Sequence, residues 1–133
     1  MLVVLALHAF ALAQPPPSTT TMAFARHPNT NCFPGHGGSV VAGALPQGYD
    51  LASLDRCKAK CIAQPGCHGV TVRERIDEAR LPGERGRPVT CWLRSNIVIE
   101  QCERKRRRKG RAFDTHVLRA GSGTNSSATT SPR

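Results

Sequence analysis

Residues 53–72, SLDRCKAKCIAQPGCHGVTV, contain a helix, a turn and a strand within 20 positions. Ser53 has the side chain of a helix N-cap, because its hydroxyl can accept a hydrogen bond from a free backbone N–H of the first turn. Cys57 and Cys61 lie one helical turn apart and so share the buried face. The Pro-Gly pair that follows stops the helix at about Ala63. The stretch therefore predicts one helix with two cysteines facing the core.

The remainder of the domain reads as short strands, because β-branched residues recur between turn residues. We expect strands at His68–Arg73, Val89–Leu93, Ile97–Ile99 and Phe113–Leu118. Residues 74–88 are polar and punctuated by Gly and Pro, which predicts a long hairpin loop. Trp92 follows Cys91 on a central strand and is expected to be buried against the Cys57/Cys61 face of the helix. The fold class predicted is α+β, with one helix on a small antiparallel sheet.

Six cysteines follow the spacing C-x24-C-x3-C-x5-C-x23-C-x10-C. An even count at compact spacing behind an apolar leader indicates a disulfide framework. The spacing alone allows 15 pairings. A zinc site of Cys57, Cys61, Cys67 and His68 is the alternative, but Cys67 follows too closely for a second ligand pair and the other cysteines would stay unpaired. No metal and no cofactor are expected.

Four motifs occur in the order found in one known family: Asn31–Gly37 with its first cysteine and glycine turn, Ser53–Val72, Cys91–Arg94 and Phe113–Val117. Together they resemble a PAN/Apple domain, in the style of PAN-like modules of secreted protist proteins. The resemblance implies a curved antiparallel sheet cradling one helix. It also implies three disulfides, Cys32–Cys102, Cys57–Cys91 and Cys61–Cys67. PAN/Apple domains bind proteins or carbohydrates and have no catalysis of their own.

Composition divides the chain into four segments. Residues 1–13 are almost wholly apolar, too short to cross a bilayer, and read as a signal peptide or as the end of a longer leader or anchor. Residues 14–28 begin with a Pro/Ser/Thr stretch and are predicted to be a linker. Residues 29–118 form the domain, and residues 119–133 are expected to be a disordered tail. The expected location is extracellular, secreted or on the cell surface.

A basic run carries seven of the chain's ten net positive charges: Arg104, Lys105, Arg106, Arg107, Arg108, Lys109 and Arg111. Three interpretations compete. The run is a solvated loop held extended by like charges, a patch for polyanions such as sulfated or acidic glycans or anionic membrane surfaces, or a dibasic processing site. Nucleic acid is not an expected partner, because the leader contradicts it and the run lacks aromatic residues for base stacking.

Catalysis is not expected. All six cysteines are assigned to disulfides, and no G-x-S-x-G nucleophile motif occurs. His36, His68 and His116 occur singly and are predicted to be surface residues. Asn125 begins the one N-x-S/T sequon, so it is a glycosylation candidate.

The function predicted from these features is a secreted or surface recognition module that binds an extracellular protein or glycan. Because fold does not fix function, the step from the resemblance to binding is an analogy. Two alternatives stay open. One is an accessory domain fragment of a larger extracellular enzyme such as a protease. The other is a cationic defence protein that acts on polyanions or membranes through the basic run.

Overall fold

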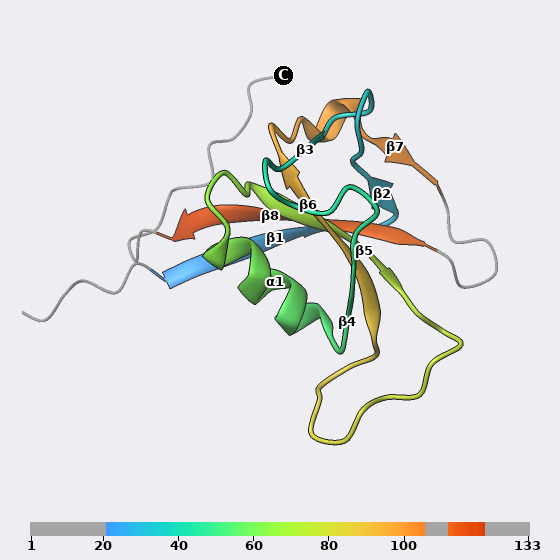
Figure 1. The fold of residues 1–133 in the computed structure, drawn as a ribbon. Coiled ribbons are helices and arrows are strands. Elements are labelled where there is room, and N and C mark those ends of the chain that lie inside the picture. Colours follow the sequence, from blue (N-terminus) through green and yellow to red (C-terminus); the bar gives the residue numbers. More distant parts are fainter. Residues whose placement is uncertain (1–20, 106–111, 122–133) are drawn as a thin grey trace, which may run out of the picture.

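The structure, a computed structural model, describes residues 21–105 and 112–121. Its main sheet has six strands in the order β1-β8-β5-β6-β3, and β4 also pairs with β6 (Figure 1). Every pairing is antiparallel. The strands are β1 (Thr21–His27), β3 (Ser39–Val40), β4 (Tyr49–Leu51), β5 (Gly69–Glu74), β6 (Val89–Ser95) and β8 (Phe113–Gly121). A second, two-stranded sheet pairs β2 (Thr30–Asn31) with β7 (Glu103–Arg104).

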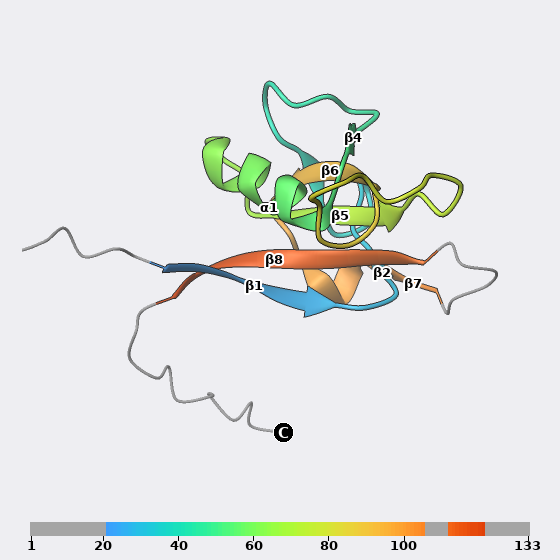
Figure 2. The same ribbon diagram turned by 90° about the horizontal axis from the view of Figure 1, so that it is seen from below.

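The predicted helix is confirmed as α1 (Leu54–Ala63). The Ser53 side chain caps it by accepting a hydrogen bond from the Arg56 backbone N–H at 3.3 Å. Figures 1 and 2 show α1 lying along one face of the sheet, where it contacts β4, β5 and β6. Its two buried residues are Cys57 and Cys61, so the helical spacing identified the packed face correctly.

The core lies between α1 and this face of the sheet. Because side chains alternate along a strand, β5 and β6 present every second residue to the helix. The fully or nearly buried members of the core are Val41, Cys57, Cys61, Cys67, Val70, Val72, Val89, Cys91 and Leu93. Such a core contains few large side chains, and the cross-links compensate for the small area that it removes from water. The molecule is a disulfide-rich α+β domain.

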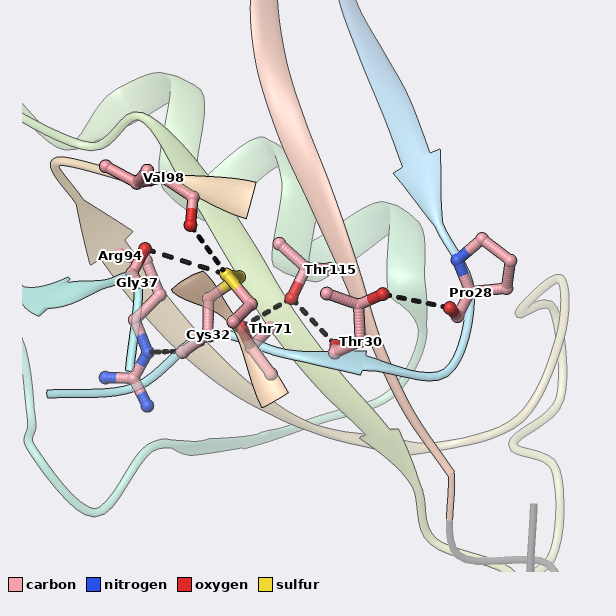
Figure 3. The surroundings of a disulfide bond; sticks show 9 residues. Pro28, Thr30, Cys32, Gly37, Thr71, Arg94, Val98 and Thr115 are labelled. Carbon is pink, nitrogen blue, oxygen red and sulfur yellow. Dashed lines mark hydrogen bonds between the residues drawn. A yellow bond between two sulfur atoms is a disulfide. The ribbon is translucent and has the colours of Figure 1, made fainter. Parts of the chain in front are cut away.

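The other face of the sheet carries a polar network instead of a second apolar layer (Figure 3). The buried hydroxyls of Thr71 and Thr115 lie 2.9 Å apart. Thr115 Oγ1 also lies 2.9 Å from the Thr30 carbonyl oxygen, and Thr71 Oγ1 lies 3.1 Å from the Cys32 carbonyl oxygen. Because each hydroxyl has one proton, two of these three contacts are hydrogen bonds at any one time. The buried Arg94 donates through Nε to the same Cys32 carbonyl at 2.7 Å. These bonds fasten the segment that contains β2 and Cys32 across the sheet.

The predicted hairpin is confirmed, because residues 75–88 connect the paired strands β5 and β6. The loop protrudes from the body of the domain in Figure 1. One ion pair links it to the helix, with Arg56 Nη2 lying 3.0 Å from Glu84 Oε1.

The strand predicted at residues 97–99 is wrong. The chain there enters a 3-10 helix, η1 (Ile99–Gln101), in which the Gln101 and Cys102 backbone N–H groups donate to residues three positions back. Asn96 has a φ of 49°, a left-handed conformation that ends β6. The Val98 N–H donates to the Gly37 carbonyl at 2.8 Å, so this segment pairs with the glycine turn and not with a strand.

The predicted domain, residues 29–118, is too short at both ends. Residues 21–27, which were assigned to the linker, form β1. Every residue of β1 is paired with a residue of β8. Residues 119–121, assigned to the tail, continue β8. The two segments were missed because neither has a β-branched run, and each becomes a strand only by pairing with the other. The predicted signal peptide, the first part of the linker and the rest of the tail lie outside the described residues.

The prediction that Trp92 packs against the helix is wrong. Cys91 faces α1, because it is bonded to Cys57, and the next side chain along a strand points to the opposite face. The Trp92 ring lies on the side of the sheet away from α1, with its centroid 5.7 Å from that of Phe113.

Candidate functional site

A groove of about 590 Å³ lies between α1 and the β1–β8 half of the sheet. The helix rests on β4, β5 and β6, whereas β8 and β1 extend the sheet beyond the helix (Figure 2). Apolar lining comes from both sides, from Phe24 of β1, Leu54 of α1, Val72 of β5 and Val89 of β6. The groove is therefore open on the part of the sheet that the short helix cannot cover.

Strand alternation gives the groove its polar residues. Asp114 and His116 lie two positions apart on β8 and point to the same face. On the neighbouring strand β1, Arg26 is paired with His116 and Phe24 with Leu118. The register of the two strands thus places a carboxylate, an imidazole, a guanidinium and a phenyl ring side by side.

His116 is the most deeply placed of these polar groups, with 3% of its surface exposed. Burial lowers the pKa of His116 from 6.5 to about 4, and the positive charge of Lys58 adds to the effect. Asp114 acts in the opposite direction, while Arg26 and His27 lower the pKa further. The imidazole is consequently neutral at pH 7 and offers an uncharged polar group to the groove.

Lys58 extends from α1 across the groove. Its Nζ lies 5.5 Å from the centroid of the Phe24 ring, a cation–π distance. Within the described part of the chain, no carboxylate forms an ion pair with this ammonium. The groove therefore holds a cation that is positioned by an aromatic ring and has not been neutralised.

Asp114, by contrast, is already engaged. Arg26 Nη2 lies 2.9 Å from Asp114 Oδ2, and the Asn29 backbone N–H donates to Oδ1 at 3.0 Å. Asn29 itself has a φ of 53°, so the turn after β1 is tightly folded. These contacts fix the end of the groove. Among the described lining residues, Lys58 and the exposed carboxylate Glu74 are the charged groups that form no ion pair.

Such an arrangement can hold a ligand through three kinds of contact. An unpaired ammonium attracts a carboxylate, sulfate or polarised hydroxyl, the neutral imidazole can exchange a hydrogen bond, and the Phe24 ring accepts an apolar face. Concave sites with an apolar lining and a few polar groups are where small ligands and side chains of partners bind.

The structure contains all three disulfides that the family resemblance implied: Cys32–Cys102, Cys57–Cys91 and Cys61–Cys67. Every cysteine is paired, so the alternative zinc site at Cys57, Cys61, Cys67 and His68 is excluded. Residues 21–105 and 112–121 contain no other cluster of three metal-ligating side chains. Cys57–Cys91 joins the helix to β6, Cys61–Cys67 joins it to the turn before β5, and Cys32–Cys102 joins the segment after β2 to the segment between η1 and β7. None of the six cysteines lines the groove.

Only the first two residues of the basic run are described. Arg104 and Lys105 are both exposed, and Lys105 Nζ lies 2.8 Å from Glu103 Oε1. The rest of the run, Arg106, Arg107, Arg108, Lys109 and Arg111, lies outside the described residues, as does the glycosylation candidate Asn125. Neither Arg104 nor Lys105 lines the groove.

Sequence reasoning missed the groove. His36 is exposed, as predicted, and its ring stacks on Phe33. His68 is also exposed and accepts a hydrogen bond from the Asn96 N–H at 2.9 Å. The surface position predicted for His116 is wrong, because it faces the helix side of β8. The alternation of Asp114, His116 and Leu118 was the available signal, but it becomes informative only once β1 is known to pair with β8.

The fold and the groove define a small, disulfide-bonded α+β domain with a concave site beside its helix. No family model, curated protein or solved structure matches the chain. None of the helices in the described segments is long and apolar enough to cross a membrane.

Proposed function

We propose that this chain is a non-catalytic recognition module of PAN/Apple type, secreted or displayed on the cell surface, which binds an extracellular protein or carbohydrate in the groove beside α1. The ordered motifs of the sequence and the three disulfides support the type of module. Disulfides persist in oxidising compartments, so the three bridges are compatible with an extracellular location.

The observation that carries the proposal is the unneutralised Lys58 beside Phe24, above the buried neutral His116. A cation in this setting has little to gain within the domain, since no described carboxylate reaches it. A ligand that brings an acidic or hydroxyl group to Lys58 and an apolar face to Phe24 satisfies both groups at once. The groove is large enough for one or two sugar rings or for a few side chains of a protein.

The proposal is tested by probing glycan and extracellular-protein arrays with the oxidised full chain and measuring the affinity of the ligands retained. Lys58→Ala is expected to weaken binding about tenfold, because a hydrogen bond to a charged group contributes about 1.5–3 kcal/mol. Lys60→Ala is the matched control. Lys60 is on the same helix and its Nζ lies 4.2 Å from the Tyr49 ring centroid, but it does not line the groove.

Equal affinities for the two variants would place the ligand elsewhere on the domain. Arrays on which the parent chain retains nothing would contradict the recognition function itself.

A second candidate function is polyanion binding through the basic run, Arg104–Arg111. The observation in its favour is the concentration of seven positive charges within eight residues of sequence. Sulfated or acidic glycans and anionic membrane surfaces are the partners of this chemistry. The two candidates are separable, because Lys58 in the groove and the basic run can be neutralised independently.

A further inference from the structure

A cluster of three side chains lies on the face of the sheet opposite α1. Trp92 of β6, Arg73 of β5 and Phe113 of β8 come from three adjacent strands. Arg73 is directly paired with Phe113, and Trp92 is paired with Thr71, two positions before Arg73. None of the three lines the groove. The cluster is therefore separate from the site of the proposed function.

The cluster is held together by its own contacts. The Arg73 guanidinium carbon lies 5.8 Å from the Trp92 ring centroid and 5.4 Å from that of Phe113. The backbone at Gly48 packs closely against the indole, because a Cβ at that position would lie 2.8 Å from Trp92 Nε1. A guanidinium stacked on aromatic rings keeps N–H groups at its edge for other acceptors. Arg73 is thus pre-organised to donate outward.

No described carboxylate forms an ion pair with Arg73. Asp50, which like Arg73 is paired with Thr90, accepts a hydrogen bond from Thr90 at 3.2 Å, and its Oδ2 lies 3.7 Å from Arg75 Nη1. The cationic cluster therefore lacks an anionic partner within the described chain.

The part of this face next to the cluster is covered. Thr71 and Thr115 are fully buried beneath the segment that contains Thr30 and Cys32 (Figure 3). The three side chains of the cluster remain partly exposed. A tryptophan, an arginine and a phenylalanine are thus gathered on a part of the face that the segment with Thr30 and Cys32 leaves open.

We propose that the Trp92–Arg73–Phe113 cluster anchors a second interaction surface, which binds an acidic segment of a partner protein. Tryptophan and arginine are enriched among the few residues that contribute most of the binding energy at protein interfaces, and a guanidinium edge matches a carboxylate with two parallel hydrogen bonds. A protein partner is favoured over a glycan because the cluster lies on an open sheet face, whereas small ligands bind in concave sites.

The test uses Trp92 as its own reporter, since the chain contains a single tryptophan. Tryptophan emission, excited at a wavelength that spares tyrosine, is followed as an acidic copolymer of glutamate and tyrosine is added to the oxidised full chain. Arg106, Arg107 and Arg108 are replaced by Ser in all samples, so that the basic run does not dominate binding. We expect a saturable change in emission with the copolymer and none with poly-L-lysine.

Arg73→Gln is expected to weaken copolymer binding about tenfold, because a charge-assisted contact is lost. Arg85→Gln is the matched control, as it removes the same charge from an exposed residue of the β5–β6 loop. Arg73→Lys keeps the charge but not the planar fork, so it is expected to bind more weakly than the parent and provides a second variant if Arg73→Gln does not fold. Lys58→Ala should leave this binding unchanged, which separates the cluster from the groove.

Three results would overturn the proposal. The first is a copolymer that leaves the emission unchanged. The second is equal binding by the Arg73 and Arg85 variants. The third is an emission change that chondroitin sulfate produces in an Arg73-dependent manner and the copolymer does not, which would assign the cluster to an acidic glycan.

Discussion

The hydroxyl groups of Thr71 and Thr115 meet at 2.9 Å inside the sheet, and neither side chain is exposed to solvent. The pair joins β5 and β8 to the segment that contains β2, because each hydroxyl also lies within hydrogen-bond distance of a backbone carbonyl of that segment. A polar pair takes the place that an apolar layer would hold in a larger domain. Its integrity should therefore matter for stability.

Thr115→Val is expected to lower the free energy of unfolding by about 1–2 kcal/mol, because the Thr30 carbonyl loses its buried donor at nearly constant side-chain shape. Urea denaturation measures the change. Thr90→Val, which removes a hydroxyl bonded to the exposed Asp50, is the control and should cost less. A Thr115→Val protein as stable as the parent would show that the network contributes little.

The disulfides should differ in their contribution to stability. Cys57–Cys91 joins residues 34 positions apart, whereas Cys61–Cys67 closes a separation of 6. The chain-entropy model gives about 4 kcal/mol for the longer loop and about 2 kcal/mol for the shorter one. Replacing both members of each pair by alanine and measuring denaturation should reproduce this order, and the reverse order would contradict an entropic origin.

Acidification should destabilise the domain through His116. Its pKa is lowered from 6.5 to about 4 by burial, so between these values the unfolded chain binds a proton that the folded chain does not. The free energy of unfolding therefore falls as the pH drops from 6.5 towards 4, by about 1.4 kcal/mol per unit and about 3 kcal/mol in all. Above pH 6.5 both states are neutral at this position, and the effect vanishes.

Denaturation series at several pH values measure this dependence. His116→Gln removes the titrating group. The difference between the parent and the variant therefore gives the contribution of His116 to the pH dependence, apart from that of the other histidines. A parent and a variant with the same slope between pH 4 and 6.5 would disprove the role of His116.

The basic run should control any affinity for polyanions. Replacing Arg106, Arg107 and Arg108 by Ser is expected to change the free energy of unfolding by less than about 0.5 kcal/mol, the usual effect of substitutions in a solvated loop. The same variant should elute from a heparin column at clearly lower salt, because the attraction between exposed charges is screened over about 8–10 Å at physiological ionic strength. If the variant and the parent elute at the same salt concentration, the run does not bind polyanions and is only a solvated loop.

Local features of the fold followed from the sequence. The N-cap at Ser53, the packed face of the helix and the hairpin of residues 75–88 depend on residues close to one another in the chain. The disulfide pairing came from the order of motifs and not from spacing, which leaves 15 possibilities.

The groove and the Trp92 cluster could not be predicted from residues that are close in the sequence. Both depend on which face of a strand points to the helix, and the predicted face of Trp92 was wrong because the sequence alone did not fix that choice. A shift of one position along a strand moves every side chain to the other face, so a small error of register exchanges core and surface.

The sequence by itself determined that this chain forms a cross-linked α+β domain, because capping, helical spacing and the cysteine motifs act over short distances. Only the tertiary structure decided that residues 21–27 complete the sheet, that His116 is buried beside Lys58, and that Trp92 joins Arg73 on the opposite face. The physical reason is that strands distant in sequence acquire their inner and outer faces from the partners with which they pair.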